Sequence, residues 1–435
     1  MTTVWVVLAS GLLAIAVVLT PWFRKHPIAT LSVYLGLGLS IPYWLGVEFG
    51  GQFLPVIFLL SVWALLMTTH ASLVVNFVDR LFLLLVAVCT LATSLGLSSS
   101  GNLVTILGSW LAPYLIGRFL ATRVPLNVLC LVFSVIGGLL AAQALIEFFL
   151  SWHPFLTVPS MSGQANVWSE IQFRGGFPRS EGALGHSISL GNVLAICVPF
   201  IILGPMKPRW KVVLVSVVAG GVMVTFSRNA LVAFVAAIVL TMVFASNAQV
   251  KHSIRLAVLG TLGLAALAIG PIYMAAIAGA SQELESSTLY RANFASVIPD
   301  VAWFGRAQIY VQIATDEWGW ASSDYPGGVI HTLDNTVLLF ALQFGWIPTA
   351  ILAILLLAVL FLLVRSHDNP ALVATASQVT TVLTVAMITQ FAYIYWLVLG
   401  LAVGYQVARN HGLDFENKSF GQRLEGSEKI KLSHL

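Results

Sequence analysis

The segment Leu333–Val364 decides the fold class: it reads LDNTVLLFALQFGWIPTAILAILLLAVLFLLV and contains one charged residue, Asp334. As a single helix it would be roughly 48 Å long at 1.5 Å per residue, which exceeds a hydrocarbon core of about 30 Å. We therefore expect its first turns to project from the membrane, with a kink near Pro348. Its apolar residues are continuous and do not alternate, which disfavours a membrane β-barrel.

The composition supports the same class for the whole chain. Hydrophobic residues make up 58% of the 435 residues and charged residues only 9%, whereas soluble proteins average about 25% charged. So few charges cannot cover a soluble surface, which excludes an ordinary cytosolic enzyme and a disordered chain. Further apolar runs lie near 3–20, 28–46, 53–69, 81–98, 102–120, 125–150, 186–205, 211–227, 229–246, 254–275, 372–389 and 391–407.

These runs predict an all-α polytopic membrane protein with about 12–13 transmembrane helices. Two long outer loops interrupt them, and we expect the larger loop to contain short helices. The predicted order is N-terminal helices 1–150, first outer loop 151–185, central helices 186–275, large outer loop 276–332, C-terminal helices 333–408 and tail 409–435.

The basic residues predict the orientation, because inner loops of membrane proteins are enriched in lysine and arginine. With the N-terminus outside, 16 of the 21 basic residues fall on inner segments: Arg24, Lys25, Arg80, Arg118, Arg123, Lys207, Arg209, Lys211, Lys251, Arg255, Arg365, Arg409, Lys418, Arg423, Lys429 and Lys431. The five that remain outside are Arg174, Arg179, Arg228, Arg291 and Arg306. Each of these exceptions requires a reason.

No metal or other cofactor is expected. Cys89, Cys130 and Cys197 all lie in apolar runs without metal-ligand spacing. The chain also lacks a Gly-rich phosphate-binding loop, an HExxH pair and a CxxC motif. The net charge of +4 is small, and it does not indicate affinity for nucleic acid. The distribution of the charged residues between the two sides of the membrane is the informative property.

The first outer loop combines glycines with Arg174 and Arg179, and ends at His186, where the next apolar run begins. Arginine forks match phosphate oxygens, and glycines let the backbone approach a ligand closely. The alternative is that the two arginines pair with Glu170 and Glu181 on a solvated loop.

Arg228 and Arg306 are the next candidates. Arg228 forms part of the short turn Thr225–Ala230 between two apolar runs, where it either faces the protein interior as a functional residue or extends to the interface. Arg306 begins a stretch to Trp320 that has approximate helical spacing and could lie on the membrane surface. Arg306 itself fits equally a ligand-binding residue or a helix-end charge.

His331, Asp334 and Asn335 would share one helix face at the end of the large loop. Asp334 has a structural explanation as a helix N-terminal residue. A histidine at the edge of the membrane, in contrast, can act as a base near neutral pH. His331 is therefore the candidate catalytic base, with Asp334 beside it.

Several arginines and one histidine at the outer face point to an anionic headgroup held at the membrane surface. A lipid diphosphate fits, because arginines can neutralise the charge that develops on a departing diphosphate. The histidine can take the proton of an acceptor hydroxyl. These parts predict metal-independent glycosyl transfer from a lipid-linked donor.

The sequence resembles the bacterial O-antigen ligase and O-antigen polymerase superfamily. The resemblance covers residues 170–365 and rests on four short motifs whose order relative to the spans is the specific part: Arg179…Gly182…His186–Gly191, Phe226–Ala230, Gly305–Arg306 and His331–Asn335 leading to Phe344–Trp346.

The resemblance implies an inverting glycosyltransferase of the bacterial inner membrane with a periplasmic active site, a periplasmic N-terminus and a cytoplasmic tail. It implies that Arg179 and Arg228 bind undecaprenyl diphosphate and that His331 activates the acceptor, with Arg174, His186, Arg306 and Asn335 as further substrate-binding candidates. Ligases often carry histidine directly before the asparagine of the last motif, where this chain has Asp334. Asp334 is therefore the alternative base.

That departure favours a polymerase of O-antigen or exopolysaccharide repeat units, whose acceptor is another lipid-linked repeat. The alternative is a ligase that transfers the glycan to lipid A–core. By resemblance, a polymerase would work with a flippase and a chain-length regulator. A transporter or flippase of the same lipid-linked glycan is the rival from another class, although transporters usually show repeated halves, which are not detected in this chain.

Overall fold

The computed structural model describes residues 19–69, 73–159, 163–245, 298–307, 335–366 and 368–410, together with isolated positions between 255 and 275. The protein is mostly helical. Its longer helices are α2 (Pro27–Ser40), α3 (Val56–Thr68), α4 (Phe77–Ser94), α6 (Ala112–Ala121), α7 (Leu126–Leu150), α9 (Ser187–Leu203), α10 (Pro208–Val224), α11 (Arg228–Phe244), α15 (Thr336–Phe344), α16 (Trp346–Arg365) and α19 (Thr389–Asn410).

Short elements connect them. They are α5 (Gly101–Val104), the π-helical turn η1 (Thr105–Leu111), η2 (Pro154–Thr157), α8 (Gln164–Trp168), η3 (Gly182–Leu184), η4 (Ile298–Asp300), α17 (Pro370–Ser377) and α18 (Val379–Thr384). The antiparallel strands β1 (Gly46–Phe49) and β2 (Gln52–Pro55) pair with Gly46 opposite Pro55, and β3 (Phe173–Arg174) pairs with β4 (Phe177–Pro178), with Phe173 opposite Pro178.

The apolar helices confirm the class predicted from composition. Five described helical segments are long and apolar enough to cross a membrane: Phe77–Ser94, Gly101–Ala121, Leu126–Leu150, Trp346–Arg365 and Thr389–Asn410. Four shorter apolar helices accompany them: α2, α3, α9 and α11. The protein is thus a helical bundle with the character of a membrane protein.

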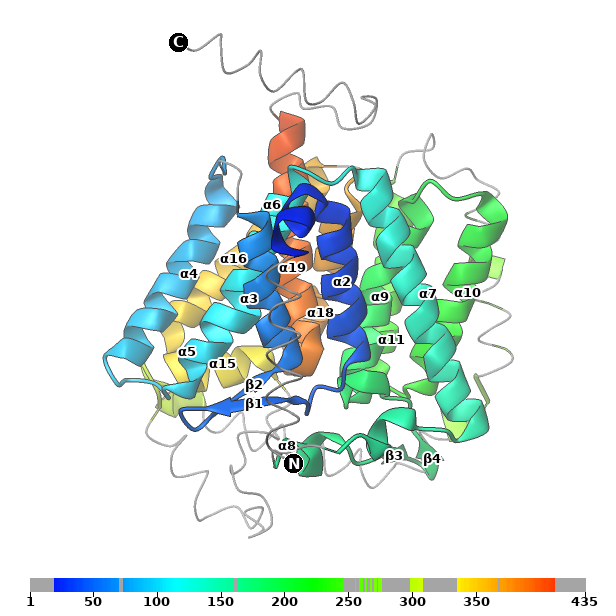
Figure 1. Cartoon of the computed structure of the whole chain (residues 1–435), viewed down its shortest axis with the longest axis horizontal. Coiled ribbons are helices and arrows are strands. Elements are labelled where there is room, and N and C mark those ends of the chain that lie inside the picture. Colours follow the sequence, from blue (N-terminus) through cyan, green and yellow to red (C-terminus); the bar gives the residue numbers. More distant parts are fainter. Residues whose placement is uncertain are drawn as a thin grey trace.

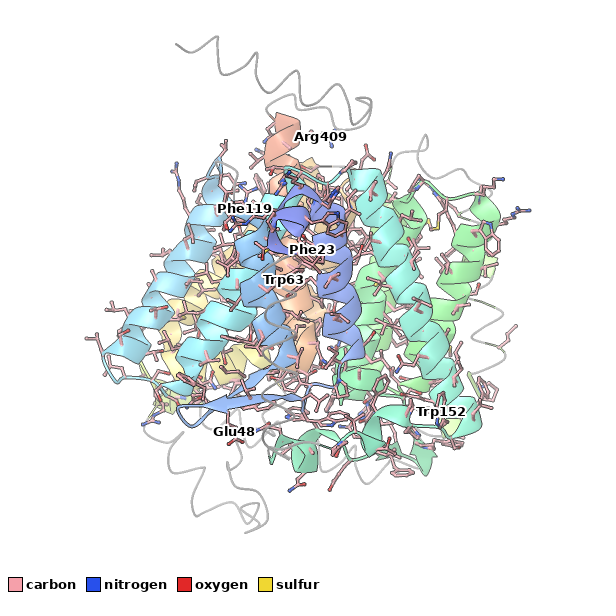
Figure 2. All side chains as sticks on the ribbon, viewed as in Figure 1. Phe23, Glu48, Trp63, Phe119, Trp152 and Arg409 are labelled. Atoms are coloured by element: carbon pink, nitrogen blue, oxygen red, sulfur yellow. The ribbon has the colours of Figure 1, made fainter. Side chains whose placement is uncertain are left out.

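Helix α19 occupies the middle of the bundle, with α3, α4 and α16 on one side and α7, α9, α10 and α11 on the other (Figure 1). Both strand pairs and α8 lie at one end, here named the loop end. The C-terminal end of α19 lies at the other, here named the tail end; Glu48 and Trp152 mark the first and Arg409 the second (Figure 2).

Helices α6 and α19 approach each other through glycine. A Cβ atom at Gly117 would collide with the backbone of Leu397, and one at Gly400 with the carbonyl of Tyr114. Small residues permit such close packing between helices that have no hydrophobic driving force between them in lipid. This contact fixes the central helix against one half of the bundle.

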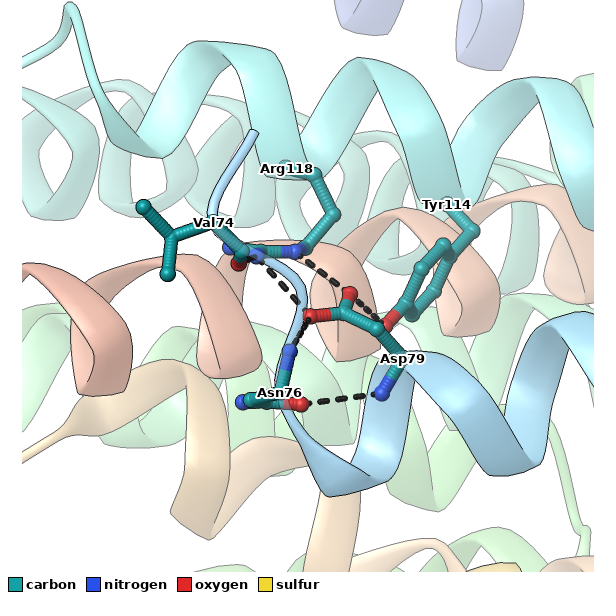
Figure 3. A network of polar contacts seen from close by, with 5 residues as sticks. All are labelled: Val74, Asn76, Asp79, Tyr114 and Arg118. Atoms are coloured by element: carbon teal, nitrogen blue, oxygen red, sulfur yellow. Dashed lines mark hydrogen bonds and ion pairs between the residues drawn. The ribbon is translucent and has the colours of Figure 1, made fainter. Parts of the chain in front are cut away.

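A buried ion pair joins α4 to α6 near the tail end (Figure 3). The Arg118 guanidinium donates from Nε to Asp79 Oδ1 at 2.7 Å and from Nη2 to Asp79 Oδ2 at 3.0 Å. Nη2 also donates to the carbonyl of Val74, and the Tyr114 hydroxyl donates to Asp79 Oδ1. The carboxylate also accepts from the backbone N–H of Asn76. Charge counting treated Arg118 as an inner-segment cation, whereas its side chain is only 1% exposed.

Two predicted helices are broken. The run 333–364 breaks at Gly345, between α15 and α16, three residues before Pro348, near which the kink was expected. Gly345 has a φ of +91°, and a Cβ there would lie 2.8 Å from backbone atoms of Ala302, Trp303 and Phe304. Only glycine satisfies both conditions readily.

The run 372–389 divides into α17, α18 and an extended stretch before α19. The Thr336 hydroxyl donates to the carbonyl of Val385 and accepts from the N–H of Met387. Backbone groups of this stretch that make no helical hydrogen bond are thereby paired within the protein, as a membrane environment requires.

Candidate functional site

The first outer loop is tied to the end of α10 through its second half. The backbone N–H of Arg179 donates to the carbonyl of Gln172, and that of Ser180 to the carbonyl of Val224. The Ser180 hydroxyl donates to the carbonyl of Ala144 in α7 at 2.7 Å. Gly175 and Gly176, both with positive φ, close the hairpin between β3 and β4.

Both loop arginines reach the turn that precedes α11. Arg174 Nη1 donates to the carbonyl oxygen of Phe226 at 2.7 Å, and Arg179 Nε donates to that of Thr225 at 2.9 Å. Arg179 also donates from Nη1 to Gln172 Oε1 at 3.1 Å and is 8% exposed. These hydrogen bonds span 52 and 46 positions of the sequence, and they bring both arginines to the same turn.

The turn itself is strained. Phe226 has a φ of +48°, which is uncommon for a bulky residue. Its ring stacks between Phe177, at 5.7 Å, and Tyr273, at 6.1 Å with an interplanar angle of 12°. The Ser227 hydroxyl accepts from the N–H of Ala230 and caps α11, so that Arg228 is the first residue of the helix.

Tyr273 lies near the same three arginines. It is 8% exposed, its hydroxyl makes no hydrogen bond with any residue that the structure describes, and the charges of Arg174, Arg228 and Arg179 act on it. We name Arg174, Arg179, Arg228 and Tyr273 the arginine cluster. Three guanidinium groups and a phenolic hydroxyl in one place provide donors suited to an anion with several oxygens.

A buried carboxyl group borders the arginine cluster. Glu181 is 5% exposed, and its Oε1 accepts from the backbone N–H of Gln172 at 2.9 Å. Burial raises the pKa of Glu181 to about 7, and the charge of Glu147 adds to the rise. The hydrogen bond from Gln172 and the charge of Arg179 lower this pKa and partly offset the effect of burial. Glu170, the other predicted acidic partner, is exposed. Glu181 therefore changes charge near neutral pH.

Glu147 supports the backbone of the same loop from α7. Its Oε2 accepts from the N–H groups of Glu181 and Gly182, at 3.2 and 3.0 Å. Its Oε1 accepts from Gln143 Nε2 at 3.3 Å, one turn earlier on the same helix.

His186 caps α9. Its Nδ1 accepts from the N–H of Ile188 at 3.2 Å, which requires an unprotonated Nδ1. Burial and the charge of Arg179 lower the pKa of His186 to about 3, so the ring is neutral at physiological pH. The ring also lies against Trp168, with centroids 6.2 Å apart. His186 thus lies between the arginine cluster and Trp168.

Trp168 leads to a cavity of about 440 Å³. Aromatic, amide and hydroxyl side chains line it, among them Asn102, Trp110, Gln164, Trp168, Gln343 and Trp396. Trp396 is 2% exposed, and its indole N–H makes no hydrogen bond with any residue in the described ranges. Among the described lining residues Arg306 is the one cation, and no carboxylate is present.

The structure therefore divides the predicted site residues. Arg174, Arg179 and Arg228 meet, with His186 beside them, whereas Arg306 lines the cavity and its backbone N–H donates to the carbonyl of Leu97 at 2.6 Å. Asn335 caps α15 through the N–H of Leu338, and the neighbouring Thr336 lines the cavity. His331 and Asp334 lie outside the described residues, as does nearly all of the stretch from Arg306 to Trp320.

Three contributors to the site were not predicted from sequence: Tyr273, Gln172 and the turn carbonyls. Tyr273 lies in an apolar run in which nothing distinguishes it from a lipid-facing aromatic residue. Gln172 bridges Arg179 and the hydroxyl of Ser187, at 3.1 and 2.9 Å. A polar residue five positions or more from any motif gives no local signal of such a role.

Among the described residues no group of three or more histidine, cysteine, aspartate or glutamate side chains could hold a metal ion. No family model, curated protein or solved structure matches this chain. The chemistry of the site therefore has to be argued from its own residues.

Proposed function

We propose that this protein is an inverting, metal-independent glycosyltransferase that moves a glycan from undecaprenyl diphosphate to a sugar hydroxyl at the periplasmic face of the inner membrane. The observation that carries the proposal is the meeting of three arginines at one turn: Arg174 and Arg179 donate to the carbonyls of this turn, and Arg228 follows it as the first residue of α11. Like cations repel each other, so three of them at one partly buried turn favour an anion with more than one charge.

The proposed topology has about 12–13 spans, with the N-terminus and the loop end periplasmic and the tail cytoplasmic. The first outer loop and the C-terminal end of α19 lie at opposite ends of the bundle, which supports this assignment (Figure 1). The tail end, which carries Arg24, Arg123 and Arg409, would then face the cytoplasm, in agreement with the positive-inside rule.

In the proposed reaction the acceptor hydroxyl oxygen attacks the anomeric carbon of the donor sugar. The bond from that carbon to the diphosphate oxygen breaks, and undecaprenyl diphosphate leaves with the electron pair. The arginine cluster stabilises the charge that develops on the leaving group. The proton of the acceptor hydroxyl passes to His331 or, as the alternative base, to Asp334.

The cavity beside Trp168 provides room for sugar rings next to this site. Tryptophan faces, amides and hydroxyls are suited to an uncharged ligand with many hydroxyl groups. The His186 ring packs against Trp168, which lines the cavity, and the charge of Arg179 acts on His186, so that His186 links the cavity to the cluster. This arrangement supports a sugar held near a diphosphate.

We propose a polymerase of O-antigen or exopolysaccharide repeats over a ligase, on the Asp334-Asn335 pair of the last motif. A deletion strain complemented with variants of this gene tests both. A polymerase predicts that loss of the gene leaves single repeat units, on the lipid carrier or on the core. A ligase predicts long chains on undecaprenyl diphosphate and a bare lipid A–core.

Substitutions in the same strain test the site. Arg179→Gln and Arg228→Gln should reproduce the deletion phenotype, whereas Arg209→Gln, which removes an exposed charge at the tail end, should not. An unchanged glycan profile in the deletion strain would refute both enzymes. A block in transport of the intact lipid-linked glycan would instead support the transporter.

A further inference from the structure

Two arginines meet at the tail end of the bundle, far from the arginine cluster. Arg24 belongs to the helical segment before α2, and Arg123 to the link between α6 and α7. Arg123 Nη2 donates to the carbonyl oxygen of Arg24 at 2.5 Å, across 99 residues of sequence. This hydrogen bond places the guanidinium group of Arg123 beside the backbone of Arg24.

Each of these arginines buries a donor that has no acceptor among the described residues. Arg24 Nε and Arg123 Nη1 are inaccessible to solvent and make no hydrogen bond with that part of the chain. Among the residues that the structure describes, neither arginine forms an ion pair. An unsatisfied donor on a charged group is costly, and it commonly marks the place of a bound ion or water.

The electrostatics agree with a missing negative charge. Burial lowers the pKa of Arg123, the direction expected for a cation withdrawn from water. The buried carboxylate of Asp79 in α4 is already paired, because Arg118 and Tyr114 donate to it (Figure 3). Asp79 therefore does not compensate the two arginines.

Aromatic residues precede Arg24 directly in the sequence. Trp22 lies 4.6 Å from the His26 ring, and Phe23 packs edge-on against Trp63 at 5.0 Å. In Figure 2 Phe23 lies in the half of the bundle nearer to Arg409, and Trp63 lies near the middle. Such rings concentrate at the level of lipid headgroups, where one side is apolar and the other wet.

We propose that Arg24 and Arg123 together bind the phosphate group of an anionic phospholipid at the tail end of the bundle. The two unsatisfied guanidinium donors would point to phosphate oxygens, and the acyl chains would extend along the bundle surface. Basic sites on the inner side of membrane proteins bind such headgroups. The site is independent of the glycosyltransferase proposal, because it lies at the opposite end of the molecule.

The test is lipid retention by the purified full-length protein, measured by native mass spectrometry. The protein is titrated with phosphatidylglycerol and, separately, with phosphatidylcholine. Arg24→Gln and Arg123→Gln should each weaken retention of phosphatidylglycerol by about tenfold, as expected for the loss of one charge-assisted contact. Retention of phosphatidylcholine should not change.

Arg80→Gln is the matched control, since Arg80 is an exposed arginine at the start of α4. An equal loss in Arg80→Gln, or no loss in the two test variants, would overturn the proposal. Competition with inorganic phosphate separates the two sources of the ligand: displacement of the lipid by millimolar phosphate would show that the site holds free phosphate instead of a headgroup.

If a glutamine variant fails to fold, Arg123→Lys replaces it. Lysine keeps the charge but lacks the planar fork, so the proposal requires weaker retention of phosphatidylglycerol by Arg123→Lys than by the wild type. A thermal-unfolding measurement on the wild type gives a second check. Phosphatidylglycerol must raise the unfolding temperature more than phosphatidylcholine does, and equal effects would refute a headgroup-specific site.

Discussion

Arg174 donates a hydrogen bond from Nη1 to the carbonyl oxygen of Phe226, 2.7 Å away and 52 residues later in the chain. Since Phe226 has a left-handed backbone, its carbonyl is presented to the outer loop and not to the next helical turn. The bond fixes the loop hairpin over the start of α11. It therefore brings Arg174 to the position where Arg228 begins that helix.

Arg228 is the member of the cluster whose loss should affect anion binding most directly. It makes no hydrogen bond or ion pair with any residue the structure describes, whereas Arg174 and Arg179 also hold the turn. Arg228→Gln should reduce turnover by a factor on the order of 10²–10³, the usual effect of removing one donor to a developing charge. Transfer from a lipid-linked donor, measured with purified protein, provides the test.

Arg228→Lys is the conservative comparison. It should recover part of the activity, because the charge returns without the bidentate geometry. Full activity in Arg228→Gln would mean that the guanidinium does not contact the leaving group.

Tyr273→Phe should weaken binding of inorganic pyrophosphate by about tenfold, because the hydroxyl is worth roughly one hydrogen bond to a charged group. Tyr395→Phe is the matched control: its hydroxyl is also buried without a partner, but no arginine of the cluster is associated with it. Calorimetric titration of both variants measures the effect. Equal affinities for the two variants would remove Tyr273 from the site.

Glu181 should make anion binding dependent on pH. Its pKa of about 7 means that the carboxyl group is neutral below that pH and negative above it. Pyrophosphate binding should weaken as the pH rises from 6 to 8 more steeply in the wild type than in Glu181→Gln, which cannot ionise. Parallel pH profiles for the two proteins would contradict this role.

The same group affects stability in a defined direction. The folded pKa of Glu181 is raised above its ordinary value of 4.5, so the folded state holds the proton more tightly than the unfolded state. Its contribution is full below about pH 4.5 and is lost as the pH rises through about 7. The unfolding temperature of the wild type should therefore decrease over this pH interval relative to that of Glu181→Gln.

The ion pair between Asp79 and Arg118 should behave as a buried unit. Asp79→Leu or Arg118→Met leaves one charge without its partner and should cost about 3–5 kcal/mol of unfolding free energy. The double change Asp79→Leu with Arg118→Met should cost less than the sum. Thermal unfolding in detergent measures this double-mutant cycle, and strict additivity would show that the two groups do not interact.

The chain's hydropathy alone predicted its class and most of its helices. Apolar runs of about 20 residues form helices in a bilayer because every backbone polar group must be satisfied within the segment. The close pairing of Gln143 with Glu147 was also predictable, because residues four apart share a helix face. These are local properties, which a window of sequence contains in full.

Tertiary structure decided which charged residues meet. Arg179 reaches Thr225 and Arg118 reaches Asp79 across 46 and 39 residues, while Arg306, a candidate of the same kind, lies at the cavity instead. The residue sequence of each loop is compatible with several partners, because the partners lie on other helices. Their choice depends on how α7, α9, α10 and α11 pack, a property that no single segment carries.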